Sequence, residues 1–299
     1  MLGEKIAAEI VHAERWIVGE SLVWSARDEA LVFVDIVGRR ILRLIPGGAL
    51  EAWETPEFAT SIGLRRSGGF IVGLSRRVCF WTPGGNFETI AAPDADLPGN
   101  RLNEGCVAPD GSFWVGTMQT NLEPDGSPRA QTANSGAYYR LAPDLGLTRL
   151  TPHEYGITNT MAWLADGSFV TADTPANALY AFPVHGGSAL GERRVFAAGF
   201  PRGLPDGSCL DAEGYLWNCR VAGGGCLVRY APDGRIDRVV DLPCSWPTSC
   251  TFGGPELATL YVASARFTMS PEHLAANPQE GAVFALDVGT RGVPAHEFG

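Results

Sequence analysis

Short apolar runs recur six times along this chain at similar spacing, and this recurrence restricts the possible folds more than any other feature. The runs follow turns rich in Asp and Gly, and their first residues lie 39 to 56 positions apart, at 31–35, 70–74, 113–117, 169–173, 216–220 and 260–264. A second short apolar run follows each of them, at 41–45, 78–82, 137–141, 178–182, 227–231 and 282–286. Paired strands repeating every ~40–50 residues are typical of the blades of a β-propeller.

We therefore predict an all-β fold, a six-bladed β-propeller formed by one domain over residues 1–299. Each blade needs about four strands, so the other two must lie in the weaker segments between the pairs. The 37 Gly and 21 Pro residues supply the many turns that this requires. A β-sandwich of about a dozen strands is the alternative, but a sandwich does not demand a repeat.

Two of the six pairs are interrupted by long segments, at 118–136 in the third unit and 265–281 in the sixth. Long loops in compact domains are usually functional. The third and sixth units lie opposite one another in a six-fold ring. We predict that both loops lie near one mouth of the central channel and that 271–276 forms a short helix.

Charge and residue counts exclude several classes of function. The formal net charge of −10 disfavours binding to nucleic acid and to anionic membranes. The only lysine is Lys5, near the start of the chain, which excludes an internal Schiff-base lysine and a P-loop. The seven cysteines contain no C-x-x-C pair and are expected to be reduced core residues. We expect a soluble cytoplasmic protein, because no signal peptide or membrane span is evident. We also expect either a monomer or a weak homo-oligomer.

The repeat also supplies a register for polar residues. Positions 10 or 11 residues before each first run are equivalent, and they are occupied by Glu20, Thr60, Asn103, Asn159, Asp206 and Ser249. Equivalent positions in a propeller lie at one height around the axis, so two carboxylates and two carboxamides should converge from four blades. Each of these residues taken singly also suits a turn, and only the shared register favours a site.

Converging carboxylates repel one another unless a positive charge lies between them. A hard divalent cation on the central axis fits Glu20, Asn159 and Asp206, with Asn103 nearby and water completing the shell. Calcium is the first expectation, and zinc, manganese or iron(II) are the alternatives. Arg101 lies two residues before Asn103 and alternates onto the same strand face. The sequence contains no H-E-x-x-H zinc motif and no G-x-S-x-G elbow.

These motifs resemble those of the senescence-marker-protein/gluconolactonase/regucalcin family of six-bladed propellers. The resemblance begins at GESLVW (19–24) and covers nearly the whole chain. It continues through FVDI (33–36), RLNEGCVAPDGSFWVGTM (101–118), ITNTMAWLADG (157–167), PDGSCLDAEGYLW (205–217) and FGGPELATLYVASA (252–265). The ordered set is specific, whereas any single piece of it would be a weak signal.

The resemblance implies roles for the residues that the register selects. Glu20, Asn159 and Asp206 would ligate one divalent metal on the axis. Asn103 would be a further contact to metal or substrate, and Arg101 would bind the substrate. Asp206 would also be the general base.

Two positions depart from the family pattern. Thr160 follows Asn159 where the family usually has Asn-Gly, and Asn103-Glu104-Gly105 stands where it usually has Asn-Asp-Gly. We expect Thr160 to affect the geometry of the ligands and Glu104 to affect contacts with the substrate.

From these residues and this resemblance we expect a metal-dependent lactonase that opens sugar (aldono-)lactones, similar to gluconolactonases and xylonolactonases. The metal would stabilise the developing oxyanion, so no nucleophilic serine or lysine is needed. A metal-bound Asp206 is a weak base, which is a difficulty for this mechanism. Two alternatives remain: a non-catalytic propeller that binds a divalent metal or another ligand, and an esterase or phosphotriesterase that uses the same metal site.

Overall fold

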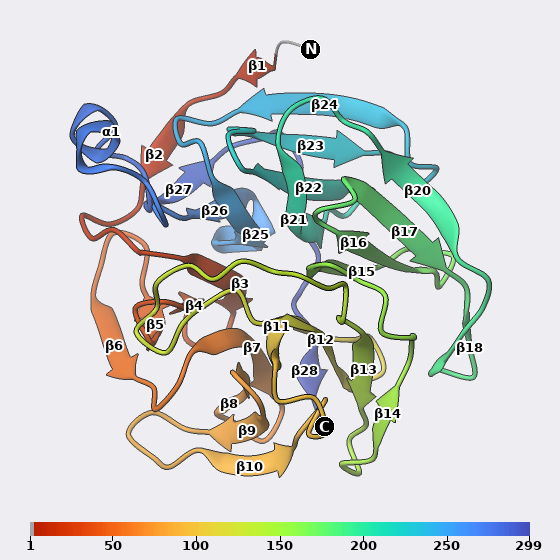
Figure 1. Cartoon of the computed structure of the whole chain (residues 1–299). Coiled ribbons are helices and arrows are strands. Elements are labelled where there is room, and N and C mark those ends of the chain that lie inside the picture. The colour runs from red at the N-terminus through yellow and green to blue at the C-terminus, as the bar shows by residue number, and fades with distance from the viewer. Residues whose placement is uncertain (1–2) are drawn as a thin grey trace.

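Residues 3–299, which the computed structural model describes, form a six-bladed β-propeller (Figure 1). Each blade contains four antiparallel strands. The strands keep their numbers in chain order, and each blade is described from its innermost strand outward. Blade one contains β3 (Gly19–Ser25), β4 (Ala30–Asp35), β5 (Arg40–Leu44) and β6 (Leu50–Glu54). Blade two contains β7 (Ala59–Arg65), β8 (Phe70–Leu74), β9 (Val78–Trp81) and β10 (Glu88–Ala91). Blade three contains β11 (Asn100–Val107), β12 (Phe113–Gln119), β13 (Tyr138–Leu141) and β14 (Leu147–Arg149).

The second half of the ring repeats this order. Blade four contains β15 (Thr158–Trp163), β16 (Phe169–Asp173), β17 (Ala178–Phe182) and β20 (Arg194–Ala198). Blade five contains β21 (Leu204–Leu210), β22 (Leu216–Val221), β23 (Cys226–Tyr230) and β24 (Ile236–Asp241). Blade six contains β25 (Pro247–Gly253), β26 (Thr259–Ser264), β27 (Val283–Leu286) and β2 (Ala8–Ile10). The prediction of a six-bladed propeller is confirmed, and the sandwich alternative is wrong.

The ring closes through strands from the two ends of the chain. Strand β2 near the N-terminus is the outermost strand of blade six and pairs antiparallel with β27. Strand β1 (Glu4–Lys5) pairs parallel with β24, and β28 (Glu297–Phe298) pairs parallel with β7. These pairs satisfy strand edges that would otherwise be open. Of the domain predicted over 1–299, residues 1 and 2 lie outside the described part.

The predicted apolar runs form the second and third strands of the blades. Strands β4, β8, β16 and β22 are buried along their full length. Because both faces of these strands pack against neighbouring blades, their sequences are continuous apolar runs rather than alternating ones. The hydrophobic cluster that contains Val34, Ile62 and Val72, for example, joins blades one and two.

Every innermost strand carries a β-bulge in its N-terminal half or at its middle. The pairing with the second strand shifts between Glu20 and Val23, Ala59 and Ser61, Leu102 and Gly105, Asn159 and Met161, Pro205 and Ser208, and Pro247 and Ser249. A bulge redirects side chains and is common beside active sites. The predicted site residues Glu20, Asn103, Asn159 and Asp206 all lie at or inside these bulges.

The remaining elements lie in the connections. Helix α1 (Pro271–Ala276) is the short helix that the sequence predicted, and the Ser270 hydroxyl caps it by accepting from the His273 N–H at 3.2 Å. Strands β18 (Val184–His185) and β19 (Ala189–Leu190) form a small hairpin, and η1 (Pro255–Leu257) is a single 3₁₀ turn. All seven cysteines are free thiols. Over residues 3–299, no helix is long and apolar enough to cross a membrane.

Candidate functional site

A cavity of about 160 Å³ opens between the innermost strands at one end of the propeller. Its lining includes all five predicted site residues, Glu20, Arg101, Asn103, Asn159 and Asp206, which come from blades one, three, four and five. Each of them is at most 9% exposed. Leu122 and Phe267 line the same cavity, so the two long loops do lie at one mouth, as the sequence predicted. We call this space the upper cavity.

Two carboxylates are buried together in the upper cavity. Burial, and then the charges of Asp206 and Glu104, hold the pKa of the Glu20 carboxyl well above its usual range. Burial, and then the charge of Glu104, raise the pKa of Asp206 in the same way. The Ser21 N–H donates to Glu20 Oε2 at 2.9 Å and fixes that side chain. The ionised forms of Glu20 and Asp206 therefore repel one another, and a cation between them would stabilise both.

The Asn159 amide is oriented by a residue that the sequence did not single out. Asn159 Nδ2 donates to Thr174 Oγ1 at 2.8 Å, and the Thr174 hydroxyl in turn donates to the Pro205 carbonyl at 2.8 Å. This pattern leaves Asn159 Oδ1 to accept from Asn103 Nδ2 at 3.2 Å. Asn159 thus presents an oxygen toward the same group of side chains. No sequence signal marks Thr174, because it lies outside the repeat register.

Arg101 is held by a second residue that sequence reasoning missed. Its Nε and Nη2 both donate to Asn121 Oδ1, at 3.2 and 2.8 Å, and its Nη1 donates to Asn103 Oδ1 at 2.8 Å. Asn121 lies on the long loop 118–136, whose length was the only sequence indication of a role. Burial lowers the pKa of Arg101 to about 10, so the guanidinium remains charged at neutral pH.

Thr160 occupies a left-handed backbone conformation with φ of 53°. A β-branched residue is strained there. Its fully buried hydroxyl contacts the Asp206 carbonyl and lies 2.9 Å from Ser208 Oγ. Asn218 Nδ2 donates to the same carbonyl at 3.1 Å and to Thr160 Oγ1 at 3.3 Å. Thr160 thus connects blade four to the backbone that carries Asp206.

The structure corrects two sequence expectations and locates a third residue. Thr248, not Ser249, is the blade-six residue that lines the upper cavity, because the bulge in β25 shifts the register by one residue. Thr60 does not line this cavity, and its hydroxyl donates to the Gly73 carbonyl at 3.3 Å. Glu104 lines a second cavity rather than the upper one, and its effect on contacts with the substrate stays a prediction. Its neighbour Asn103 points into the upper cavity, and the side chains of successive strand residues point to opposite sides.

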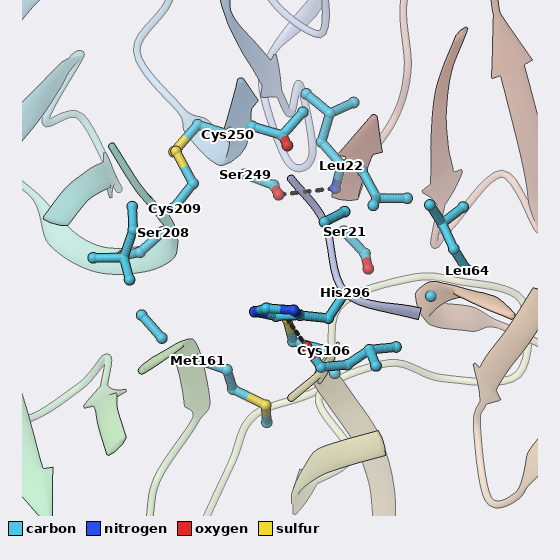
Figure 2. Close-up of a pocket in the computed structure, with 18 of the residues that line it drawn as sticks. Ser21, Leu22, Leu64, Cys106, Met161, Ser208, Cys209, Ser249, Cys250 and His296 are labelled. Atoms are coloured by element: carbon cyan, nitrogen blue, oxygen red, sulfur yellow. Dashed lines mark hydrogen bonds between the residues drawn. The ribbon is translucent and has the colours of Figure 1, made fainter. Parts of the chain in front are cut away.

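The second cavity, which we call the lower cavity, has a volume of about 150 Å³, and its lining includes residues that follow the site residues along the innermost strands, such as Ser21, Glu104 and Ser208 (Figure 2). Residues 293–296 near the C-terminus form part of its wall, and Figure 2 shows the His296 side chain directed into it. Burial lowers the pKa of the His296 imidazole. Cys209 and Cys250 also line this cavity, with their Sγ atoms 3.5 Å apart.

The donor set of the upper cavity fits a hard divalent cation. It offers oxygen atoms from two carboxylates and one oriented carboxamide, and such ligands suit calcium and related ions. Within residues 3–299, no three His, Cys, Asp or Glu side chains gather closely enough to hold a metal by themselves. A bound ion would therefore need Asn159 and water as well as Glu20 and Asp206.

Comparison with known proteins gives a consistent result. The chain is 33% identical to regucalcin of Gallus gallus over 98% of both chains. It is 34% identical to a 6-deoxy-6-sulfogluconolactonase of Pseudomonas putida, covering 92% of this chain and 93% of that one. A solved structure from Agrobacterium tumefaciens, described as a calcium-binding protein, regucalcin, superposes with a TM-score of 0.89 at 26% identity and covers 99% of this chain and 98% of that one. Residues 18–266 match the family model described as SMP-30/Gluconolactonase/LRE-like region, and the chain belongs to that family.

Proposed function

We propose that this protein is a lactonase that hydrolyses sugar lactones, and that Glu20, Asn159 and Asp206 hold one divalent cation, calcium first among the candidates. The observation that carries the proposal is the burial of two carboxylates beside an inward-facing carboxamide, with no lysine in the cavity. When bound, the cation supplies a Lewis acid for the lactone carbonyl. Membership of a family with lactonase relatives supports the same chemistry.

The protein's own residues supply the rest. Asp206 accepts a proton from the attacking water at its carboxylate, which Thr160 and Asn218 position through the Asp206 carbonyl. Arg101 donates a hydrogen bond to an oxygen atom of the substrate. Asn103 contacts the substrate through its Oδ1, because its Nδ2 already donates to the Thr158 carbonyl and to Asn159 Oδ1. Asn121 holds the guanidinium in place for this contact, which lowers the entropic cost of binding.

The test is acid release from D-glucono-1,5-lactone and D-xylono-1,4-lactone, corrected for spontaneous hydrolysis. We expect the rate to fall to background in EDTA and to recover with added calcium, zinc or manganese. Asp206→Asn should abolish turnover, and Asp233→Asn, at an exposed turn, serves as the matched control. Activity that survives both EDTA and Asp206→Asn would exclude this mechanism. Simple esters and phosphotriesters in the same panel test the alternative chemistry.

A second candidate function is calcium binding without catalysis. It is favoured by the regucalcin relatives and by the related structure that is described as calcium-binding. Isothermal titration with calcium separates the two functions. Binding that Glu20→Gln removes, in a protein that hydrolyses no lactone in the panel, would support the non-catalytic function.

A further inference from the structure

The upper cavity is strongly apolar around its polar residues. Beside the five site residues and the polar residues Asn121, Thr174 and Thr248, its lining consists of Val18, Ile36, Val37, Leu122, Ile157, Val221, Trp246, Ala265 and Phe267. Five of these, namely Val18, Ile36, Val37, Leu122 and Phe267, belong to one hydrophobic cluster, and we call them the apolar wall. The wall comes from blade one and from both long loops, so it forms a continuous surface.

An anionic substituent would also be disfavoured against this surface, because the apolar wall contains no charged or hydrogen-bonding side chain. Among the described residues that line the upper cavity, Arg101 is the only cation, and it is not part of the wall. Its Nε, Nη1 and Nη2 atoms donate to Asn121, Asn103 and the Leu102 carbonyl, which hold the guanidinium in place.

We propose that the preferred substrate is an uncharged deoxy-sugar lactone, whose terminal carbon is a methyl group that packs on the apolar wall. This inference rests on the proposed lactonase function. A hydroxymethyl group in the same place would bury a hydroxyl against Val37, Leu122 and Phe267, whose side chains have no hydrogen-bonding atoms. The methyl group instead gains burial. Discrimination at a single small group in an apolar pocket is about tenfold or more.

The experiment compares kcat/KM within matched pairs of lactones that differ only at carbon 6. Suitable pairs are 6-deoxy-L-galactono-1,4-lactone with L-galactono-1,4-lactone, and 6-deoxy-D-glucono-1,5-lactone with D-glucono-1,5-lactone. We expect the deoxy member to be preferred by about tenfold, and anionic D-glucaro-1,4-lactone to be the poorest substrate. Equal rates for the two members of a pair, or a preference for the 6-hydroxy lactone, overturn this inference but agree with the proposed lactonase function. Hydrolysis of no lactone overturns the proposed function, and this inference with it.

Variants of the wall make the test specific. Phe267→Gln should reduce the preference for the deoxy lactone several-fold, because it places a polar group beside the methyl. Phe87→Gln is the matched control, since Phe87 packs on the same hydrophobic cluster but does not line the cavity. Val37→Thr, a smaller change, should act in the same direction if Phe267→Gln folds poorly. An unchanged preference in Phe267→Gln and Val37→Thr would contradict the inference.

A separate observation concerns the lower cavity. Cys209 on β21 and Cys250 on β25 belong to the innermost strands of blades five and six, and their Sγ atoms lie 3.5 Å apart. Both residues line the cavity, and Cys209 is only partly buried, so a small solute in the cavity would meet this pair. We infer that Cys209 and Cys250 form a reversible disulfide between the two blades when a small peroxide enters.

The step balances without a further reagent. One thiolate attacks a peroxide oxygen and becomes a sulfenic acid, and the other thiol then displaces water from it. Two thiols and hydrogen peroxide thus yield one disulfide and two waters. A thiol reductant reverses the reaction by exchange.

Peptide mapping after hydrogen peroxide treatment tests this inference. We expect one linked peptide pair that contains Cys209 and Cys250, lighter by two hydrogens and released by dithiothreitol. Cys106, which lines the same cavity, should remain alkylatable and is the internal control. In Cys209→Ser the link should be absent. Oxidation of Cys106 in preference to the pair, or no link at a peroxide excess that oxidises methionine, would refute the inference.

Discussion

Thr160 allows a sharp test of how the propeller positions its central residues. Its hydroxyl contacts the Asp206 carbonyl and Ser208 Oγ, and its side chain is fully buried. Thr160→Ala removes both contacts, at about 1 kcal/mol each. Asn218 Nδ2, which also donates to this hydroxyl, keeps the Asp206 carbonyl and Ser208 Oγ as acceptors, so its loss adds little. It also removes a buried methyl group worth about 0.8 kcal/mol. The expected loss in the free energy of unfolding is therefore about 2–3 kcal/mol.

Thr160→Gly should be less harmful than Thr160→Ala, although it removes more atoms. The backbone at this position has a φ of 53°, which glycine adopts freely and alanine does not. At such positions alanine costs more than the ~0.4–1 kcal/mol that it saves by restricting the unfolded chain. We thus expect the order of stability to be wild type, then Thr160→Gly, then Thr160→Ala, with about 1 kcal/mol between the two variants.

The assay is guanidinium unfolding followed by tryptophan fluorescence, with the midpoints compared at a common slope. Asn218 still donates to the Asp206 carbonyl in both variants, so no buried carbonyl is left without a partner. If Thr160→Ala is as stable as wild type, the hydroxyl contacts do not stabilise the fold. If Thr160→Gly is less stable than Thr160→Ala, the left-handed backbone at this position does not cost alanine the free energy that we assign to it.

Three further predictions address the site and the blades. Calcium at 100 times its Kd should stabilise the protein by ~2.7 kcal/mol in thermal unfolding, and a shift that persists in Glu20→Gln would contradict the ligand assignment. Asn121→Ala should raise KM for a lactone several-fold with little change in kcat, because Arg101 loses the contacts that hold it, whereas Asn134→Ala in the same loop should not. Burial raises the pKa of Asp94, but hydrogen bonds from groups that include Tyr139 and Asn100 lower it overall. The stability from Asp94 is therefore present above pH ~4 and lost on further acidification, and Asp94→Asn should flatten that part of the unfolding profile.

Much of the fold was predictable from the sequence because a propeller repeats one local pattern. The second strand of a blade is buried on both faces, so it must be a continuous apolar run, and β8 and β16 coincide with predicted runs. The spacing of these runs also brought Glu20, Asn159 and Asp206 into one register, and the structure places them around one cavity. Their roles as metal ligands and base remain predictions that the proposed experiments test.

What the sequence determined by itself was the number of blades, the short helix α1 and the set of polar residues that converge. The tertiary structure alone decided that β2 closes blade six, that Thr248 rather than Ser249 lines the upper cavity, and that Glu104 lines the lower one. It also decided that Asn121 and Thr174 hold Arg101 and Asn159. The physical reason is that a local pattern records only which residues are buried. The size of a bulge and the partner of a hydrogen bond depend on how neighbouring blades pack.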